Sequence, residues 1–189
     1  MRPSYLRKWS SPDGTPLAMR PIAAHDGPGI AGALRSLSPE TRRLRFLGPV
    51  NAIPDAFVHA LIEADPETQY VVIVVRLDSR DEVTIAGGRI VASDEAGVWE
   101  FALLVADASQ GHGLGNQLLK ALIEEARRRK LKRLVGHVSV DNRPMLRIAR
   151  KHGFWITRDP QDASTCVATL EIGYERRSKS SWFTEWFGR

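Results

Sequence analysis

The strongest chemical signal in the sequence is a glycine-rich hexapeptide, Gln-Gly-His-Gly-Leu-Gly, at residues 110–115, followed by Asn116. Glycines let the backbone approach a ligand closely, and consecutive N–H groups at the start of a helix bind anions. The spacing lacks the third glycine of a dinucleotide fingerprint, and no Gly-Lys-Ser/Thr follows as in a nucleotide P-loop. The hexapeptide therefore predicts an anion cradle of another kind.

The elements on either side must position this loop. From residue 113 to residue 130, leucine, isoleucine and alanine recur at helical spacing, which predicts an amphipathic helix. Before the loop, three apolar segments starting at residue 68 are separated by charged turns, which predicts an antiparallel meander of three strands. The last of these strands ends near Val105. An antiparallel strand before the loop is the wrong setting for a Rossmann unit.

The rest of the chain supplies further strands and short helices. A hairpin is expected over 5–22, with helices inside 26–37, 38–46 and 54–63, capped by Asp26 and by Ser38 where those helices begin. After the amphipathic helix we expect a strand at 133–139, a helix at 143–152 capped by Asp141 or Asn142, and strands at 154–157 and 165–174. This order is typical of an α+β domain with a mixed sheet.

Length and composition bound the remaining possibilities. With 189 residues, 43% of them hydrophobic, and a mean hydropathy of −0.24, the chain suits one soluble domain, expected over 1–174, with a separate tail at 175–189. The lone Cys166 cannot form an intramolecular disulfide, which favours the cytoplasm. The longest aliphatic run, at 71–75, has the length of a strand, so we expect no membrane span.

The hexapeptide resembles the hallmark of the GNAT superfamily of acyl-CoA-dependent N-acetyltransferases. That hallmark is Gln or Arg, two residues, Gly, one residue, and Gly or Ala, and it is matched by Gln110, Gly113 and Gly115. Asn142 and the Gly-Phe pair at 153–154 also match, so the resemblance spans roughly 16–174. Residues 19–22, Asp26, and residues 37–46 and 99–102 are similar to the protein-lysine acetyltransferase (Pat-like) branch.

The resemblance implies a fold and a co-substrate. The fold would be α+β: a central, mixed, mostly antiparallel twisted sheet flanked by helices. The co-substrate would be acetyl-CoA, with its pyrophosphate on the N–H groups of the loop, its pantetheine along the strand near Val105, and a backbone N–H near Leu104 polarising the thioester carbonyl. The implied cofactor-binding residues are Leu104, Val105, Gln110, Gly111, His112, Gly113, Leu114, Gly115, Asn116 and Asn142.

The resemblance also implies a general base, Glu100, ten residues before Gln110. An acceptor lysine with a pKa of about 10.4 must lose a proton before it attacks. If Trp99 and Phe101 are core residues, strand alternation turns Glu100 toward the groove. The alternative is a solvated strand carboxylate. His137 on the next strand is a competing base, although a lone histidine in Val-Gly-His-Val is more typical of a packed residue.

Three functions remain open at this point. The first is transfer of an acetyl group to a protein lysine. The second is the same reaction on a small-molecule amine, which the acidic block 51–100 would attract. The third is a non-catalytic acyl-CoA-binding regulatory module, because many GNAT enzymes have a tyrosine acid on the helix after Asn142, and here Ala149 stands where that tyrosine is expected.

The remaining features bear on metal, nucleic-acid, protein and membrane partners. The histidines lack the spacing and carboxylate partners of a metal site, so no metal is expected. The cluster Arg42, Arg43 and Arg45 fits a nucleic-acid patch or a contact with an acidic substrate, but short basic helices are usually solvated, and no nucleic-acid partner is expected. The tail carries two Trp-Phe pairs, at 182–183 and 186–187, which favour packing on the domain, a homodimer contact, or docking to a membrane or target.

Overall fold

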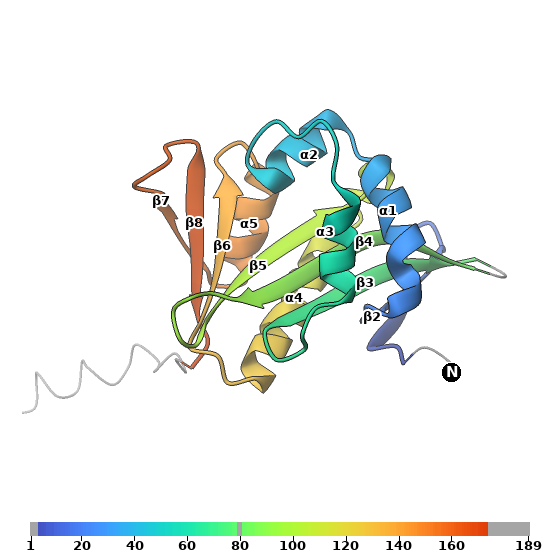
Figure 1. Cartoon of the computed structure of the whole chain (residues 1–189), viewed down its shortest axis with the longest axis horizontal. Helices are drawn as coiled ribbons and strands as arrows, with labels where there is room; N and C mark the ends of the chain where they lie inside the picture. Colours follow the sequence, from blue (N-terminus) through green and yellow to red (C-terminus); the bar gives the residue numbers. More distant parts are fainter. Residues whose placement is uncertain (1–3, 79–80, 174–189) are drawn as a thin grey trace, which may run out of the picture.

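The computed structural model describes residues 4–78 and 81–173, which form one mixed sheet with helices on both faces (Figure 1). The sheet has eight strands in the order β1-β2-β3-β4-β5-β6-β8-β7. Within this described part, β5 and β6 run parallel and the other neighbours are antiparallel. The strands are β1 (Arg7–Ser10), β2 (Pro16–Pro21), β3 (Gln69–Leu77), β4 (Glu82–Ala92), β5 (Val98–Val105), β6 (Arg133–Ser139), β7 (Trp155–Arg158) and β8 (Thr165–Glu171).

The helices are α1 (Gly27–Arg35), α2 (Pro39–Phe46), α3 (Asp55–Ile62), α4 (Leu114–Arg128) and α5 (Arg143–Lys151). Ser38 caps α2 by accepting a hydrogen bond from the Thr41 N–H at 3.1 Å, as predicted. Asn142 caps α5 in the same way, through the Met145 N–H. The side-chain cap expected from Asp26 on α1 was wrong. Its carboxylate instead accepts hydrogen bonds from buried Arg20 and from the Ala23 N–H, because an ion pair satisfies it better than a cap.

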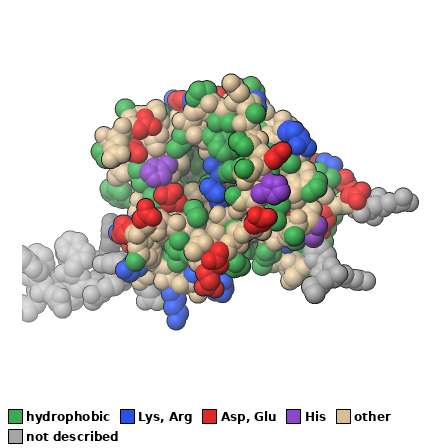
Figure 2. Space-filling view, in the orientation of Figure 1, with side chains coloured by type: hydrophobic (Ala, Val, Ile, Leu, Met, Phe, Trp, Pro, Cys, Tyr) green, Lys and Arg blue, Asp and Glu red, His purple; other side chains and the backbone are tan. Residues whose placement is uncertain are grey.

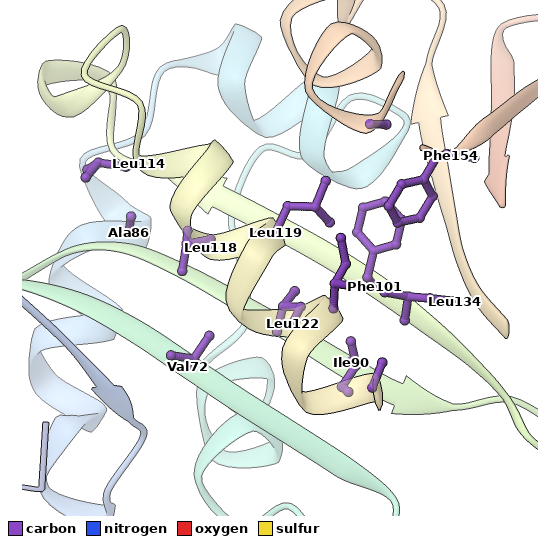
Figure 3. Packing of buried hydrophobic residues seen from close by; sticks show 14 of the residues in the cluster. Val72, Ala86, Ile90, Phe101, Leu114, Leu118, Leu119, Leu122, Leu134 and Phe154 are labelled. Carbon is purple, nitrogen blue, oxygen red and sulfur yellow. The ribbon is translucent and has the colours of Figure 1, made fainter. Parts of the chain in front are cut away.

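The predicted amphipathic helix, α4, covers one face of the sheet. Figure 3 shows its leucines lying over the central strands. Leu118, Leu119 and Leu122 are fully buried against residues such as Val72 and Ile90. This is the main core, because each strand of the meander contributes every second side chain to it. In Figure 1, α5 lies behind the sheet with α4.

The opposite face is covered by α1 and α3, which lie in front of the sheet in Figure 1. Buried Ile30 and Leu34 from α1 pack with Val58 and Leu61 from α3 against Val71 of β3. None of the described helices combines the length and apolar character needed to cross a bilayer. The aromatic tail at 175–189 lies outside the described residues, so its packing and the homodimer stay predictions.

The parallel pair β5 and β6 separates after three paired residues. Val98, Trp99 and Glu100 pair with Arg133, Leu134 and Val135, and the pairing ends there. Beyond the last pair, the ring of Phe101 on β5 packs against Gly136 of β6. A Cβ atom built on Gly136 of β6 would lie 2.3 Å from Cε1 of Phe101 on β5. The same ring packs edge-on against Phe154, with ring centroids 5.1 Å apart (Figure 3).

We predict that Gly136→Ala destabilises the protein by about 1–3 kcal/mol, because the added methyl overlaps the Phe101 ring in a packed core. Urea unfolding followed by circular dichroism measures this loss. Gly32→Ala is the matched control. A Cβ at Gly32, inside α1, meets no atom within 4 Å, so this change should stabilise the protein by roughly 0.4–1 kcal/mol. Equal stability of Gly136→Ala and the wild type would contradict the packing of Phe101 on Gly136.

Candidate functional site

The separation of β5 from β6 opens a groove of about 690 Å³. Its walls come from the second half of β5, the glycine-rich loop, the start of α4, β6, and the helices α2 and α5. The groove brings together nine of the ten predicted cofactor-binding residues: Leu104, Val105, Gln110, Gly111, Gly113, Leu114, Gly115, Asn116 and Asn142. The tenth, His112, is exposed and lies outside the lining.

The glycine-rich loop adopts a backbone that requires glycine at two positions. Gly111 and Gly113 have φ angles of 80° and 79°, in the left-handed region. Gly113 is the N-cap of α4, and no side chain caps the helix. In the described part of the chain, the N–H groups of residues 111–116 donate to no protein acceptor. These free donors at the positive end of a helix form a cradle that fits a pyrophosphate.

The loop is tied to α2 by a small polar network. Asp107, just after β5, accepts hydrogen bonds from the Ser38 N–H at 2.9 Å, the Ser38 hydroxyl at 2.7 Å and the Thr41 hydroxyl at 2.6 Å. Partial burial raises the pKa of Asp107, but these hydrogen bonds outweigh it and hold the pKa below its usual value. Gln110 donates to the Thr41 hydroxyl oxygen at 3.1 Å and to the Val105 carbonyl at 3.2 Å. The network therefore fixes the position of α2 relative to the cradle.

Two basic residues in the groove escaped the sequence-based prediction. Arg147 and Lys151 project from α5 and line the groove. Both are exposed, so they add positive charge near the loop. They lie four residues apart and share one face of the helix, and this spacing was the available signal. Asn116 at the start of α4 contacts α5 as well, through its Oδ1 atom 3.0 Å from Nε2 of His152.

Glu100 is the last residue of β5 that pairs with β6. Its neighbours Trp99 and Phe101 are buried in the main core, at 7% and 6% exposure, and Glu100 itself is exposed on the other face. Strand alternation therefore turns Glu100 toward the face that carries α1 and α3. Glu100 stands at the edge of the groove, outside its lining residues.

His137, the competing base, lines the groove from β6. Its Nδ1 atom lies 3.6 Å from Oδ2 of Asp159, and its side chain is 40% exposed. It therefore is not the fully packed histidine that the sequence favoured. No tyrosine is among the described residues that line the groove, and Ala149 is fully buried.

The basic cluster of α2 is not one solvated face. Arg43 pairs with Glu40 at 2.9 Å and with Asp141 at 3.2 Å on the surface. Arg45 instead lines the groove. Burial lowers the pKa of Arg45 to about 10, with a smaller effect from the charge of Arg89. The expectation of a solvated face was thus wrong for Arg45, because the last turn of α2 lies over the sheet. Among the described residues, no three His, Cys, Asp or Glu side chains gather as metal ligands.

Residues 36–154 match the model of the acetyltransferase (GNAT) family, which is more than half of the chain. The chain belongs to the GNAT family. A curated relative, acetyltransferase PA5475 of Pseudomonas aeruginosa, is 29% identical to this GNAT chain over 160 residues, covering 85% of this chain and 86% of the relative.

Solved structures show the same fold. The GNAT domain of S. lividans PAT has a TM-score of 0.76 at 22% identity, covering 87% of this chain and 96% of that domain. The yncA protein of Salmonella typhimurium, solved with its cofactor acetyl-CoA, has a TM-score of 0.63 at 18% identity, covering 87% of this chain and 98% of that one. The predicted GNAT fold is therefore confirmed, and the protein is an acetyl-CoA-dependent N-acetyltransferase.

We predict that Gly113→Ala weakens the binding of CoA to this GNAT protein about 10-fold in Kd, because an alanine at φ 79° is strained by roughly 1–2 kcal/mol and the loop relaxes away from the cradle. Isothermal titration calorimetry measures the change. Gly14→Ala, at φ 85° in the β1–β2 turn, carries the same strain away from the groove and is the control. Equal loss of affinity in both variants would contradict a specific role of the loop.

Proposed function

We propose that this protein transfers the acetyl group of acetyl-CoA to a primary amine, with a protein lysine as the leading acceptor and Glu100 as the general base. The observation that carries the proposal is the position of Glu100. It stands where β5 and β6 part, on the sheet face opposite Phe101 and beside the groove that contains the cradle. An amine that enters from the side of α1 and α3 meets Glu100 at this point.

The chemistry requires the nitrogen to lose two protons and to replace sulfur on the acetyl carbon. Acetyl-CoA supplies a thioester whose carbonyl carbon accepts the amine. Glu100 takes the proton that the ammonium form must lose, directly or through a water molecule. The free amine then attacks the acetyl carbon, its nitrogen gives up a second proton to water, and the carbon–sulfur bond breaks with the electron pair leaving on sulfur. With no tyrosine among the described groove residues, the sulfur takes its proton from water or leaves as the thiolate.

The backbone of β5 can hold the negative charge that develops on the carbonyl oxygen. The Ala106 N–H donates to the Ile85 carbonyl, and the Ser93 N–H donates to the Val98 carbonyl, with unbroken register between them. The backbone N–H and C=O groups of even-numbered β5 residues therefore point toward β4. Those of odd-numbered β5 residues point toward the opening between β5 and β6. Leu104 lines the groove, but its N–H faces β4, so we propose the Leu103 N–H as the oxyanion donor.

The cofactor-binding residues act in three groups under this proposal. The N–H groups of residues 111–116 bind the pyrophosphate, and His112 takes part through its backbone alone. The open edge of β5 up to Val105 pairs with the pantetheine arm, and the Gln110 side chain braces this edge. Asn142 begins α5 and so places Arg147 and Lys151, whose charges attract the phosphates.

The acceptor has two candidates. A protein lysine is favoured by the residues that resemble the Pat-like branch at 19–22, 37–46 and 99–102. A small amine is favoured by a cavity of only about 70 Å³ that adjoins the groove beneath α1 and α3. A non-catalytic acyl-CoA-binding module is the third possibility. Thiol release measured over a mixture of proteins and a panel of small amines separates the three.

We predict that Glu100→Gln keeps the Kd for acetyl-CoA within about twofold and lowers kcat by roughly 10²- to 10⁴-fold, because an amide cannot accept the proton. Thiol release under saturating acetyl-CoA measures kcat. Glu67→Gln, an exposed change outside the groove, is the control. His137→Gln should keep kcat within a few-fold of the wild type. If His137→Gln loses turnover and Glu100→Gln does not, the base is His137.

A further inference from the structure

Two arginines share a small, otherwise apolar cavity beneath α1 and α3. Arg45 reaches it from the last turn of α2, and Arg89 reaches it from β4. The cavity of about 70 Å³ adjoins the acetyl-CoA groove, because Arg45, Ala102, Leu103 and Leu104 line both. Figure 2 shows basic side chains inside a hollow on this face, with hydrophobic side chains around them.

Neither guanidinium has a hydrogen-bond or ion-pair partner in the described part of the chain. Within residues 4–78 and 81–173, no hydrogen bond or ion pair joins either side chain to another group, and the buried Nε atom of Arg89 has no acceptor. Arg20 shows how this protein otherwise buries an arginine. Its guanidinium, 3% exposed, is paired with Asp26 at 2.7 Å and with Glu82 at 2.6 Å. Arg45 and Arg89 are half-buried, and two half-buried like charges without a carboxylate partner are costly.

Aromatic rings hold the two guanidiniums without using their donors. Arg45 lies over the ring of Phe46, 5.0 Å from its centroid, and Arg89 lies over Phe57, 5.6 Å from its centroid. The two rings pack edge to face at 5.6 Å. A cation–π contact uses the face of a guanidinium and leaves the in-plane N–H groups available. The cluster is therefore a pair of cations that pack on aromatic rings and have no hydrogen-bond acceptor among the described residues.

The charge state of the pair is maintained at neutral pH. Burial lowers the pKa of Arg45 to about 10, and burial lowers the pKa of Arg89 while the charge of Glu100 opposes this. A guanidinium group is not deprotonated in proteins near neutral pH, so both arginines carry a positive charge. Bidentate binding of a carboxylate or a phosphate is the recognition that fixed arginine forks perform best.

The pair also lies on the same face as the general base. Val91 pairs with Glu100 and Arg89 pairs with Ala102, so Arg89 and Glu100 are diagonal neighbours on β4 and β5. We propose that the acceptor carries an anionic group, a carboxylate or a phosphate, which binds between Arg45 and Arg89 while the amine of the same acceptor meets Glu100. This inference rests on the proposed function. The anion can belong to a small amino acid or to an acidic residue near a lysine in a peptide.

Acceptor pairs that differ in one charge test the proposal. Lysine against cadaverine removes the carboxylate from a small acceptor. A Lys-Asp peptide against a Lys-Asn peptide, both N-acetylated and C-terminally amidated, removes it from a peptide. We predict that Arg89→Gln lowers kcat/KM for the anionic member of the preferred pair by about 10- to 100-fold and leaves the neutral member within a few-fold. The pair that shows the selective loss identifies the source of the anion. Equal losses for both members would overturn the proposal.

A binding experiment separates this inference from the reaction. With the protein saturated with CoA to fill the phosphate cradle, acetate or inorganic phosphate at millimolar concentration should raise the Tm of the wild type and of Glu100→Gln. The rise should be absent in Arg89→Gln and reduced in Arg89→Lys. Arg35→Gln, an exposed arginine at the end of α1, should behave as the wild type.

The outcomes distinguish the two proposals. Anion stabilisation with full turnover in Glu100→Gln would remove the base assignment and leave the anion site standing. Turnover that depends on Glu100 without anion stabilisation would overturn the anion site alone. If Arg45→Gln and Arg89→Gln weaken CoA binding itself, the arginines serve the cofactor and the proposal fails. Unfolding curves in the absence of anion show whether each variant folds.

Discussion

The contact between the Phe101 ring and Gly136 is the constraint on which the site depends. A side chain at Gly136 has no room, because the ring lies against Gly136 in the main core, just after the last paired residues of β5 and β6. Because the strands part there, the far half of β5 keeps one free backbone edge inside a groove. The same point of separation places Glu100 at the end of the paired region, on the face opposite the ring.

Helix α2 links the groove to the neighbouring cavity that contains Arg45 and Arg89. Ser38 and Thr41 at the start of α2 are bonded to Asp107 and Gln110, which flank the cradle, while Arg45 at its end lines both cavities. A single short helix therefore fixes the glycine-rich end of the groove relative to the cavity that contains Arg45 and Arg89. This explains how a helix with no fully buried residue holds a defined position.

Positive charge is used in two different ways around the groove. At the glycine-rich loop, the N–H donors and exposed Arg147 and Lys151 face solvent, where their charge is screened. In the neighbouring cavity, Arg45 and Arg89 lie among apolar side chains. There a charge interaction is stronger, and a charge without a partner costs more free energy. The first arrangement suits attraction of a large anion, and the second suits selection of a small one.

The sequence by itself determined the order of elements, the loop at residues 110–115, the cap Ser38 and a cap at Asp141 or Asn142, because these depend on local periodicity, glycine and capping chemistry. The GNAT fold followed from the family resemblance carried by Gln110, Gly113 and Gly115. Only the tertiary structure decided that Arg45 leaves the surface and meets Arg89, that the Leu104 N–H faces β4, and that Arg147 and Lys151 reach the groove. Such facts depend on strand register and helix placement. Register and placement are set by packing between residues far apart in the chain, which local spacing does not encode.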